Sequence, residues 1–300
     1  MALTPPGQTL APVLMTFFAA ILWGLWWIPI RYLEGLGLSE GQVAIAGNLG
    51  AMLATAFYLI LTRQMPRLDR RALCGAVLVG VAVSSYSIAI VLTDVMRAVL
   101  LFYLAPAWSK IIEWAFLGQR WRHSSTLTLL LSLCGAFLVL GGEVSVSQIG
   151  PGDILAIVSG IAWAIGAALV FTGGAAHAMS VTLATMTSAT LVAAGYMLAI
   201  GDSLPQAGMM PAIGLSLALG AFFVLPVMAL TMWSAQRLTP ALLSFLFTLE
   251  ILSGVISGAF LLDEVFGVVQ LLGAILIVGA ALVEVAIALR ARPRHAPGLL

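Results

Sequence analysis

The chain has 300 residues, of which 62% are hydrophobic and only 8% are charged, and its mean hydropathy is +1.11. A soluble domain carries about a quarter charged residues, so this composition excludes a soluble globular protein and indicates a polytopic membrane protein. The net charge of +1 says little about partners, whereas the placement of the basic residues along the chain says more.

Ten stretches are long and apolar enough to cross the membrane, because about 20 helical residues span a hydrocarbon core ~30 Å thick. The connections between them are short, so we expect no extramembrane domain for soluble catalysis or for nucleic acid. The sequence therefore predicts an all-α polytopic membrane protein with ten transmembrane helices. The expected spans are residues 10–32, 41–62, 72–92, 96–117, 124–141, 154–172, 180–200, 210–233, 239–262 and 267–289.

The basic residues favour one orientation. With a cytoplasmic N-terminus, ten arginines fall on the cytoplasmic side and only Arg31 and Arg97 fall on the other. Cytoplasmic loops carry an excess of Lys and Arg. We therefore expect a multi-pass protein of a bacterial inner membrane with both termini in the cytoplasm. The ten arginines are Arg63, Arg67, Arg70, Arg71, Arg120, Arg122, Arg237, Arg290, Arg292 and Arg294.

The two halves of the chain are similar in order. The segment AVLLFYLAP at 98–106 parallels LSFLFTLEI at 243–251, and ILWG, ATAFY and CGAFLVLGG each have a later counterpart in IAWA, VAAGY and LGAILIVGA. Five spans is an odd number, so the second copy enters the membrane from the opposite side. We therefore expect residues 1–147 and 148–300 to form two inverted five-helix repeats with a substrate site between them, as in secondary transporters.

Several motifs resemble those of the drug/metabolite transporter (DMT) superfamily of the EamA type. They are LWG in the first span, LGQRW at 117–121 and LLDEVF at 261–266. The run TLEILSG at 248–254 and the aromatic first span also resemble the YddG-type exporters of aromatic amino acids. The resemblance implies a basket of ten helices in which spans 1, 3, 4, 6, 8 and 9 surround a central cavity. One departure is Gln119, which stands where the family usually has Glu.

Five aromatic residues are candidates for that cavity. Trp23 and Trp163 recur at equivalent positions of the two halves, Trp27 lies one turn from Trp23, Tyr86 sits in the run SSYS, and Tyr103 shares a stripe with the charges of the fourth span. Aromatic faces suit a flat apolar ligand, and the indole N–H is a donor. Core packing would explain either Trp equally well, and Ser hydroxyls can bond to their own helix.

The segment FYLAPAWSKIIEW at 102–114 places Lys110 and Glu113 three residues apart within an apolar span. One interpretation is an ion pair in which the lysine extends to the cytoplasmic face. The other is an ammonium that faces the cavity and meets a substrate carboxylate, because charges at depth usually mark pathways. The two can hold together.

Glu250 is the deeper carboxylate, near the midplane at ~18 Å from the cytoplasmic end of its span. Ser253 and Ser257 share its helix face. It could bind a substrate amino group or a transported proton, or it could hydrogen-bond a neighbouring helix as structural glue. We include Glu250 and Ser253 among the candidate substrate-binding residues, together with Lys110.

Three prolines, Pro29, Pro106 and Pro226, lie inside expected spans 1, 4 and 8. A proline inside a helix removes a hydrogen bond and kinks it. Packing alone can require a kink, but these three fall in helices expected to line the cavity. We therefore predict that they are hinges or kinks.

The sequence predicts a secondary transporter that exports small amphipathic metabolites, most of all aromatic amino acids, by alternating access. A broad-specificity exporter of drugs or other metabolites with the same fold is the alternative. A lipid-modifying enzyme fits poorly, because no His, Cys or carboxylate constellation appears at depth. We expect no enzymatic activity, metal or cofactor, and no use of ATP by the chain itself, since no phosphate-binding loop is present. Its partners would be the small-molecule substrate and the lipid bilayer, and the energy coupling and oligomeric state stay open.

Overall fold

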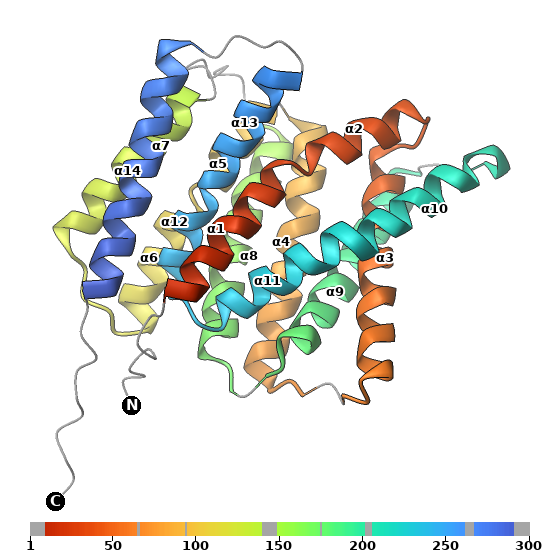
Figure 1. The fold of residues 1–300 in the computed structure, drawn as a ribbon, viewed down its shortest axis with the longest axis horizontal. Coiled ribbons are helices and arrows are strands. Elements are labelled where there is room, and N and C mark those ends of the chain that lie inside the picture. The colour runs from red at the N-terminus through yellow and green to blue at the C-terminus, as the bar shows by residue number, and fades with distance from the viewer. Residues whose placement is uncertain are drawn as a thin grey trace, which may run out of the picture.

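The computed structural model describes residues 10–64, 67–93, 95–139, 149–174, 176–201, 206–261 and 267–290, and these form helices without a strand (Figure 1). The helices of the first half are α1 (Leu10–Gly24), α2 (Trp27–Gly35), α3 (Glu40–Leu61), α4 (Arg70–Leu92), α5 (Val95–Phe102), α6 (Ala105–Phe116) and α7 (His123–Val139). Those of the second half are α8 (Pro151–Thr172), α9 (Ala178–Ile200), the 3₁₀ turn η1 (Ala207–Met209), α10 (Met210–Leu219), the π-helical turn η2 (Gly220–Val224), α11 (Leu225–Ala235), α12 (Pro240–Phe247), α13 (Leu249–Leu261) and α14 (Val268–Arg290).

The chain is a multi-pass membrane protein, and the part of it that the structure describes contains helices and no strand. Within the described residues, nine helical stretches of 19 to 29 residues are long and apolar enough to cross a membrane, and each coincides with an expected span to within a few residues. The other expected span, 124–141, corresponds to the shorter apolar helix α7, and residues 140–148 lie outside the described part. Ten membrane-crossing helices therefore stay a prediction.

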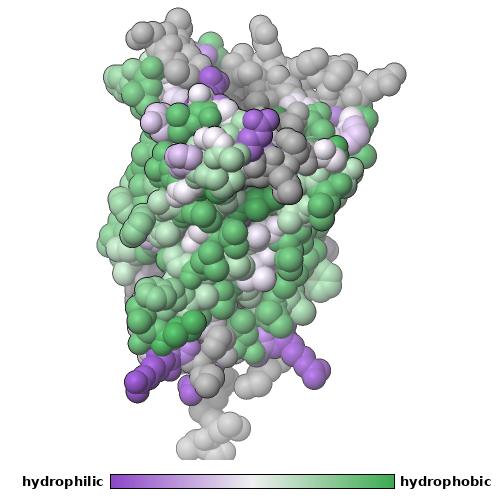
Figure 2. All heavy atoms as spheres, turned by 90° about the vertical axis from the view of Figure 1, so that its right-hand side faces the viewer, coloured by the Kyte–Doolittle hydropathy of each residue, from purple (hydrophilic) through white to green (hydrophobic). Residues whose placement is uncertain are grey.

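The surface has the polarity that a bilayer requires. Figure 2 shows apolar side chains around the middle of the visible face, with hydrophilic ones mostly toward the two ends. Large apolar side chains are exposed on the surface, including Phe222 at 85% and Leu198 at 84%. Such exposure would promote aggregation in water, but it is favourable against lipid tails. Helices satisfy their own backbone groups there, which is why the spans are helical.

Helices α4 and α8 run antiparallel and touch through their backbones. A Cβ placed on Gly75 would lie 2.8 Å from the carbonyl oxygen of Gly166, and one on Gly166 would lie 2.9 Å from the carbonyl oxygen of Gly75. Only glycine allows such an approach, and the contact is reciprocal. Gly135 of α7 and Gly273 of α14 face each other in the same way.

An aspartate at each end ties α4 to α8. Asp69 precedes α4 and accepts hydrogen bonds from the backbone N–H groups of Ala72 at 2.8 Å and of Gly174, just past α8, at 2.9 Å. Asp153 in the first turn of α8 accepts from the hydroxyl of Thr93, at the end of α4, at 2.9 Å. Outside the membrane-spanning segments, the bonds from Gly174 and Ala72 hold the pKa of Asp69 below its ordinary value.

Four spans are interrupted within their length. Helix α1 gives way to α2 at Leu25–Trp26, α5 to α6 at Tyr103–Leu104, α12 to α13 at Thr248, and the π turn η2 separates α10 from α11. The prolines predicted to be hinges or kinks, Pro29, Pro106 and Pro226, each lie in the first turn of the helix that follows an interruption. In the first turn of a helix a backbone N–H has no partner within that helix, so proline, which lacks this N–H, is tolerated there.

Candidate functional site

A cavity of about 260 Å³ lies between the two halves of the chain. Its walls come from the spans that the resemblance implied and also from α3 and α9, because the cavity extends between the ends of these helices. At one end it reaches Glu34 and Gly41, which lie at the termini of α2 and α3. We call this the open end. The opposite end stops at Trp163, Thr231 and Ser244.

Aromatic rings form the middle of the cavity. Trp23, Tyr86, Tyr103 and Trp163 all line it. Tyr86 packs on Phe102 with ring centres 4.6 Å apart, and Phe102 meets Tyr103 edge-on at 5.3 Å. The cavity therefore offers flat apolar surfaces on more than one side.

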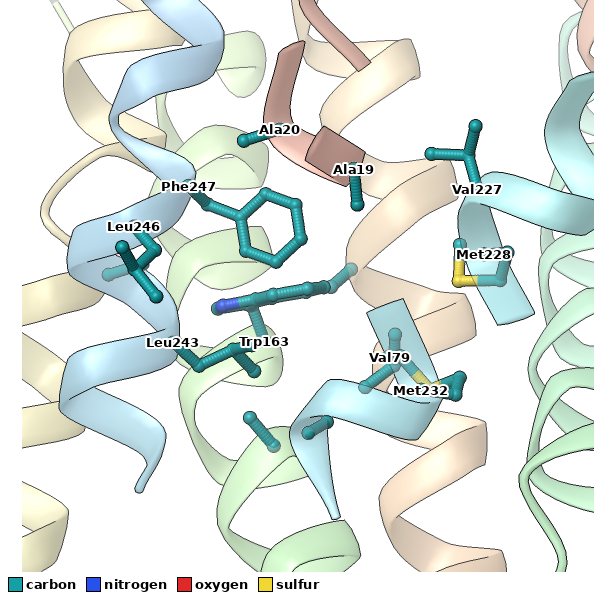
Figure 3. Packing of buried hydrophobic residues seen from close by; sticks show 14 of the residues in the cluster. Ala19, Ala20, Val79, Trp163, Val227, Met228, Met232, Leu243, Leu246 and Phe247 are labelled. Atoms are coloured by element: carbon teal, nitrogen blue, oxygen red, sulfur yellow. The ribbon is translucent and has the colours of Figure 1, made fainter. Parts of the chain in front are cut away.

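Trp163 forms part of the floor. It is 8% exposed and meets Phe247 edge-on with ring centres 5.4 Å apart, and Figure 3 shows both rings among Val79, Met228 and Met232. Packing and site roles thus coincide in this residue, since one side of the ring is core and the other borders the cavity.

The indole N–H groups of the two matched tryptophans are used within the protein. Trp23 Nε1 donates to the Thr231 hydroxyl and Trp163 Nε1 donates to the Ser244 hydroxyl, both at 3.2 Å. The donors that the sequence offered for orienting a ligand are therefore directed at neighbouring helices. These two residues therefore contribute the faces of their rings to the cavity.

Glu250 lies in the first turn of α13, directly after the interruption at Thr248, and borders the cavity. Its carboxyl group interacts with the hydroxyl of Tyr103, which also donates to the carbonyl oxygen of Phe247 at 3.3 Å. Among the described residues, no cationic side chain forms an ion pair with Glu250. Glu250 is therefore a carboxyl group at depth with polar neighbours and space in front of it.

The lining is acidic overall. Two carboxyl groups, Glu34 and Glu250, border the cavity, and none of its lining residues in the described part of the chain is Lys, Arg or His. A carboxylate without a cationic partner in a low-dielectric cleft attracts cations. The arrangement suits a ligand with a positively charged group and a flat apolar body.

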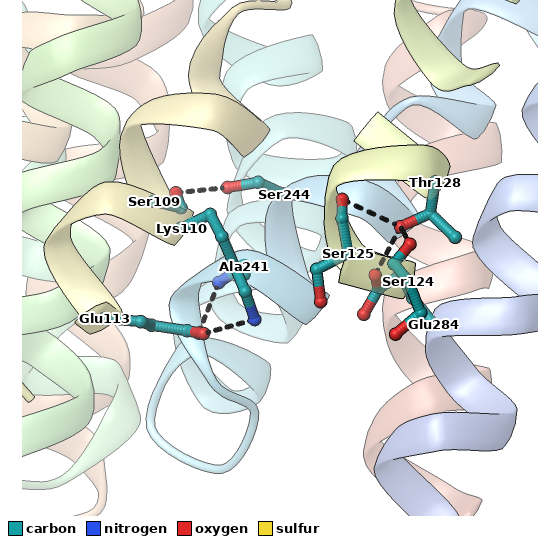
Figure 4. Close-up of polar contacts among 9 residues, drawn as sticks. All are labelled: Ser109, Lys110, Glu113, Ser124, Ser125, Thr128, Ala241, Ser244 and Glu284. Carbon is teal, nitrogen blue, oxygen red and sulfur yellow. Dashed lines mark hydrogen bonds and ion pairs between the residues drawn. The ribbon is translucent and has the colours of Figure 1, made fainter. Parts of the chain in front are cut away.

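Lys110 lies away from this lining. Its ammonium group is 3.4 Å from the carboxylate of Glu113. The other oxygen of that carboxylate accepts from the backbone N–H of Ala241 at 2.8 Å (Figure 4). The ion pair of the sequence analysis is thus present in the structure, and the structure does not bring Lys110 to the cavity.

Other candidate residues also lie beside the cavity rather than on it. Trp27 Nε1 donates to the hydroxyl of Ser257 at 2.9 Å, which joins α2 to α13. The Ser253 hydroxyl donates to the carbonyl oxygen of Ile21 at 3.0 Å and packs against Gly24 of α1. Pro106 borders the cavity, whereas Pro29 and Pro226 do not.

The candidates missed several polar lining residues, which include Ser84, Ser87, Thr231 and Ser244. Glu34, Asn48 and Tyr196 were missed as well, and they border the cavity near the open end. Asn48 had a signal, since it is an amide inside an apolar span. Glu34 lies between two expected spans, and Tyr196 lies in an expected span outside the implied basket. A cluster of three or more His, Cys, Asp or Glu residues that could hold a metal ion does not occur among the residues that the structure describes.

Comparison with known proteins gives three findings. Residues 10–141 match the model of the EamA-like transporter family. An uncharacterized transporter of Archaeoglobus fulgidus is 36% identical over 103 residues, which make up 34% of this chain and 37% of that protein. The chain thus matches little more than a third of the length of this curated relative. A solved crystal structure of a protein aligns over 93% of this chain and 98% of its own, with a TM-score of 0.74 and 19% identity, which shows a shared fold.

Proposed function

We propose that the chain is an EamA-type secondary transporter of the DMT superfamily that exports small amphipathic metabolites, aromatic amino acids above all. The observation that carries this is Glu250, a carboxyl group without a cationic partner among the described residues, at the edge of an aromatic cavity between the two halves. The match of residues 10–141 to a transporter family supports the class. The name of the Archaeoglobus protein supports it as well.

The proposed pose follows from the lining. The ring of the substrate lies among Trp23, Trp163 and Tyr86, and its ammonium group meets Glu250. A hydrogen bond to a charged group contributes about 1.5–3 kcal/mol, and ring contacts add about 0.5–1.5 kcal/mol each. The cavity volume of about 260 Å³ is close to the lower bound of ~300 Å³ for small-molecule sites, so a single compact ligand fills it.

Alternating access is part of the proposal. The cavity reaches one end of the bundle and stops short of the other. Two features support an inverted repeat: α5 ends at Phe102 and α12 at Phe247, which are matched residues of the aligned segments, and α7 and α14 meet through reciprocal glycines. Rocking of such repeats about a site near the midplane exposes it to either side in turn.

A second candidate substrate class is lipophilic organic cations. The acidic lining favours it, because an amino acid also needs a partner for its carboxylate and no Lys, Arg or His of the described residues borders the cavity. The Asn48 amide and the cavity hydroxyls are donors that this carboxylate could use. A competition panel of amino acids against lipophilic cations separates the two classes.

The test is uptake of radiolabelled Phe and Trp into proteoliposomes by the wild type, Glu250→Gln and Glu284→Gln. Glu284 is a matched control, since it is a buried carboxyl group that bonds to Thr128 between α7 and α14, away from the cavity. We expect Glu250→Gln to lower transport by about 10-fold or more and Glu284→Gln to retain it. Wild-type transport by Glu250→Gln would contradict the role of Glu250, and transport of lipophilic cations alone would select the second class.

The orientation of the protein in the membrane and its energy coupling can be measured with the same vesicles. We propose that the protein lies in a bacterial inner membrane with both termini in the cytoplasm, which protease access to a terminal tag would check. Uptake with and without a pH gradient distinguishes a facilitator from a proton antiporter. Recovery of chemically unchanged substrate inside the vesicles distinguishes a transporter from an enzyme.

A further inference from the structure

A buried carboxylate joins the two halves of the chain beyond the cavity floor. Glu113 is 3% exposed, and its partner Ala241 is 2% exposed. Ala241 is the second residue of α12, where backbone N–H groups have no partner within the helix. The carboxylate of Glu113 accepts from this N–H at 2.8 Å and is favoured there by the positive end of the helix dipole. A residue of the first half thus completes a helix of the second half.

Two serines continue this contact toward the cavity. The hydroxyls of Ser109 and Ser244 are 2.9 Å apart, and Ser244 also accepts from Trp163. Ser109 and Glu113 are four residues apart on α6, and Ala241 and Ser244 are three apart on α12, so each pair occupies one helix face. Figure 4 shows these faces opposed. We call this contact of α6 with α12 the closed end.

The open end has different residues at the matched positions. The alignment of 98–106 with 243–251 places Val255 opposite Lys110 and Gly258 opposite Glu113. Neither residue can supply a carboxylate to a helix N-terminus. Helix α6 therefore has a carboxylate that joins it to a second helix at the closed end, whereas its counterpart α13 has none at the matched position. The cavity reaches the open end, where this carboxylate is lacking.

We propose that Glu113 is a latch: its bond to the N–H of Ala241, supported by Lys110, holds the closed end shut and makes the conformation open at the other end the resting one. For the cavity to open at the closed end, α6 and α12 must separate at this bond. Water entering the opened end can hydrate both partners, so the separation is reversible. The purpose of the latch depends on the proposed transport function, whereas its measurement does not require a substrate.

The test is cysteine labelling of purified full-length protein by a water-soluble maleimide. The exposed native cysteines Cys74 and Cys134 are first replaced by Ala. Ala241→Cys then reports on the closed end and Ser87→Cys, a cavity residue on α4, on the open end. In the unlatched protein we expect labelling at position 241 to be about 10-fold faster and labelling at position 87 to be slower, because loss of a buried charged hydrogen bond shifts the two-state population.

Glu113→Ala removes the latch. Glu113→Gln is a second variant of nearly the same volume, and it removes only the charge. We expect it to give a smaller effect, because its amide oxygen can still accept from Ala241. Lys110→Gln should give a smaller rise still, because the Ala241 bond stays. Glu284→Gln removes the charge of another buried carboxyl group and should change neither rate. Unchanged labelling at position 241 in both Glu113 variants would overturn the proposal.

Faster labelling at position 241 without slower labelling at position 87 would also overturn it, since that result means fraying of α12 alone. If reciprocal labelling changes occur but no aromatic amino acid or cation is transported, the latch stands and the proposed function fails. The two proposals therefore fail by different measurements.

Discussion

The α4–α8 and α6–α12 contacts both join the first half of the chain to the second and both include hydrogen bonds, but the first also brings two helix backbones together at glycines, which α6 and α12 lack. Gly75 and Gly166 bring the backbones of α4 and α8 together without intervening side chains. Helices α6 and α12 meet through Ser109, Glu113 and their hydrogen-bond partners. When a glycine contact opens, nothing replaces the close packing of the two backbones. When serine and carboxylate groups separate, each can form hydrogen bonds to water instead. We infer that the first contact is permanent and that the second can open.

The largest expected effect is on the permanent contact. In Gly166→Val, the added Cβ would lie 2.9 Å from the carbonyl oxygen of Gly75 and 3.0 Å from the backbone nitrogen of Val79. Backbone atoms of a packed helix pair cannot move aside, so we expect a loss of about 3 kcal/mol of stability. Thermal denaturation followed by size-exclusion chromatography would measure it.

Gly195 of α9 is the matched control, because nothing lies within 4 Å of an added Cβ there. Gly195→Ala should be neutral or stabilise the protein by up to about 1 kcal/mol through helix propensity. Equal thermal stability of Gly166→Val and wild type would mean that α4 and α8 are not in direct contact.

An intermediate effect is expected at the contact that can open. Ser244→Ala leaves both the Ser109 hydroxyl and the Trp163 indole N–H without their shared partner, which should cost about 1–2 kcal/mol. Ser109→Ala leaves the Trp163–Ser244 bond in place and should cost about half as much. The same denaturation assay gives the order of the two variants, and the reverse order would show that Ser244 is not the shared group.

The smallest effect belongs to the exposed end of α4. The pKa of Asp69 is lowered by its bonds to Gly174 and Ala72. The stability that the ionised carboxylate adds to the folded protein is therefore fully present above its ordinary pKa near 4, and it is lost as the pH falls through the lowered value. Asp69→Asn keeps an acceptor for Ala72 but loses one for Gly174. Because Asp69 is exposed, we expect the substitution to lower the stability by less than about 1 kcal/mol at pH 7. The difference in stability between the wild type and Asp69→Asn should be smaller at pH 3 than at pH 7. A larger difference at pH 3 would contradict the lowered pKa.

The nine spans found among the described residues were predictable because each depends on hydropathy over about 20 residues, which a single sequence contains. Pro29, Pro106 and Pro226 lie in the first turns that follow three of the four interruptions, and their role as hinges or kinks stays a prediction. The interruption at Thr248 was not predicted, because no proline follows it. The Thr248 hydroxyl instead donates to the carbonyl oxygen of Phe245 at 2.6 Å, and such side-chain bonds to the helix backbone have no reliable sequence signal.

The site was predictable in its residue types more than in its geometry. Helical spacing grouped Glu250 with Ser253 on one face, yet the first borders the cavity and the second bonds to α1. Periodicity gives a face, but which helix covers that face depends on tilt and on contacts between the halves. Asn48 and Tyr196 were missed for the same reason, since α3 and α9 border the cavity only near its open end.

The most direct test of the central claim is equilibrium binding of tryptophan, tryptamine and indole-3-propionate to the purified wild type and to Glu250→Gln. We expect the wild type to bind both ammonium-bearing ligands and to bind indole-3-propionate much more weakly. Glu250→Gln should weaken the first two by about 10-fold or more and leave the third unchanged. Indole-3-propionate bound as tightly as tryptophan, or unchanged binding of all three by Glu250→Gln, would contradict the account.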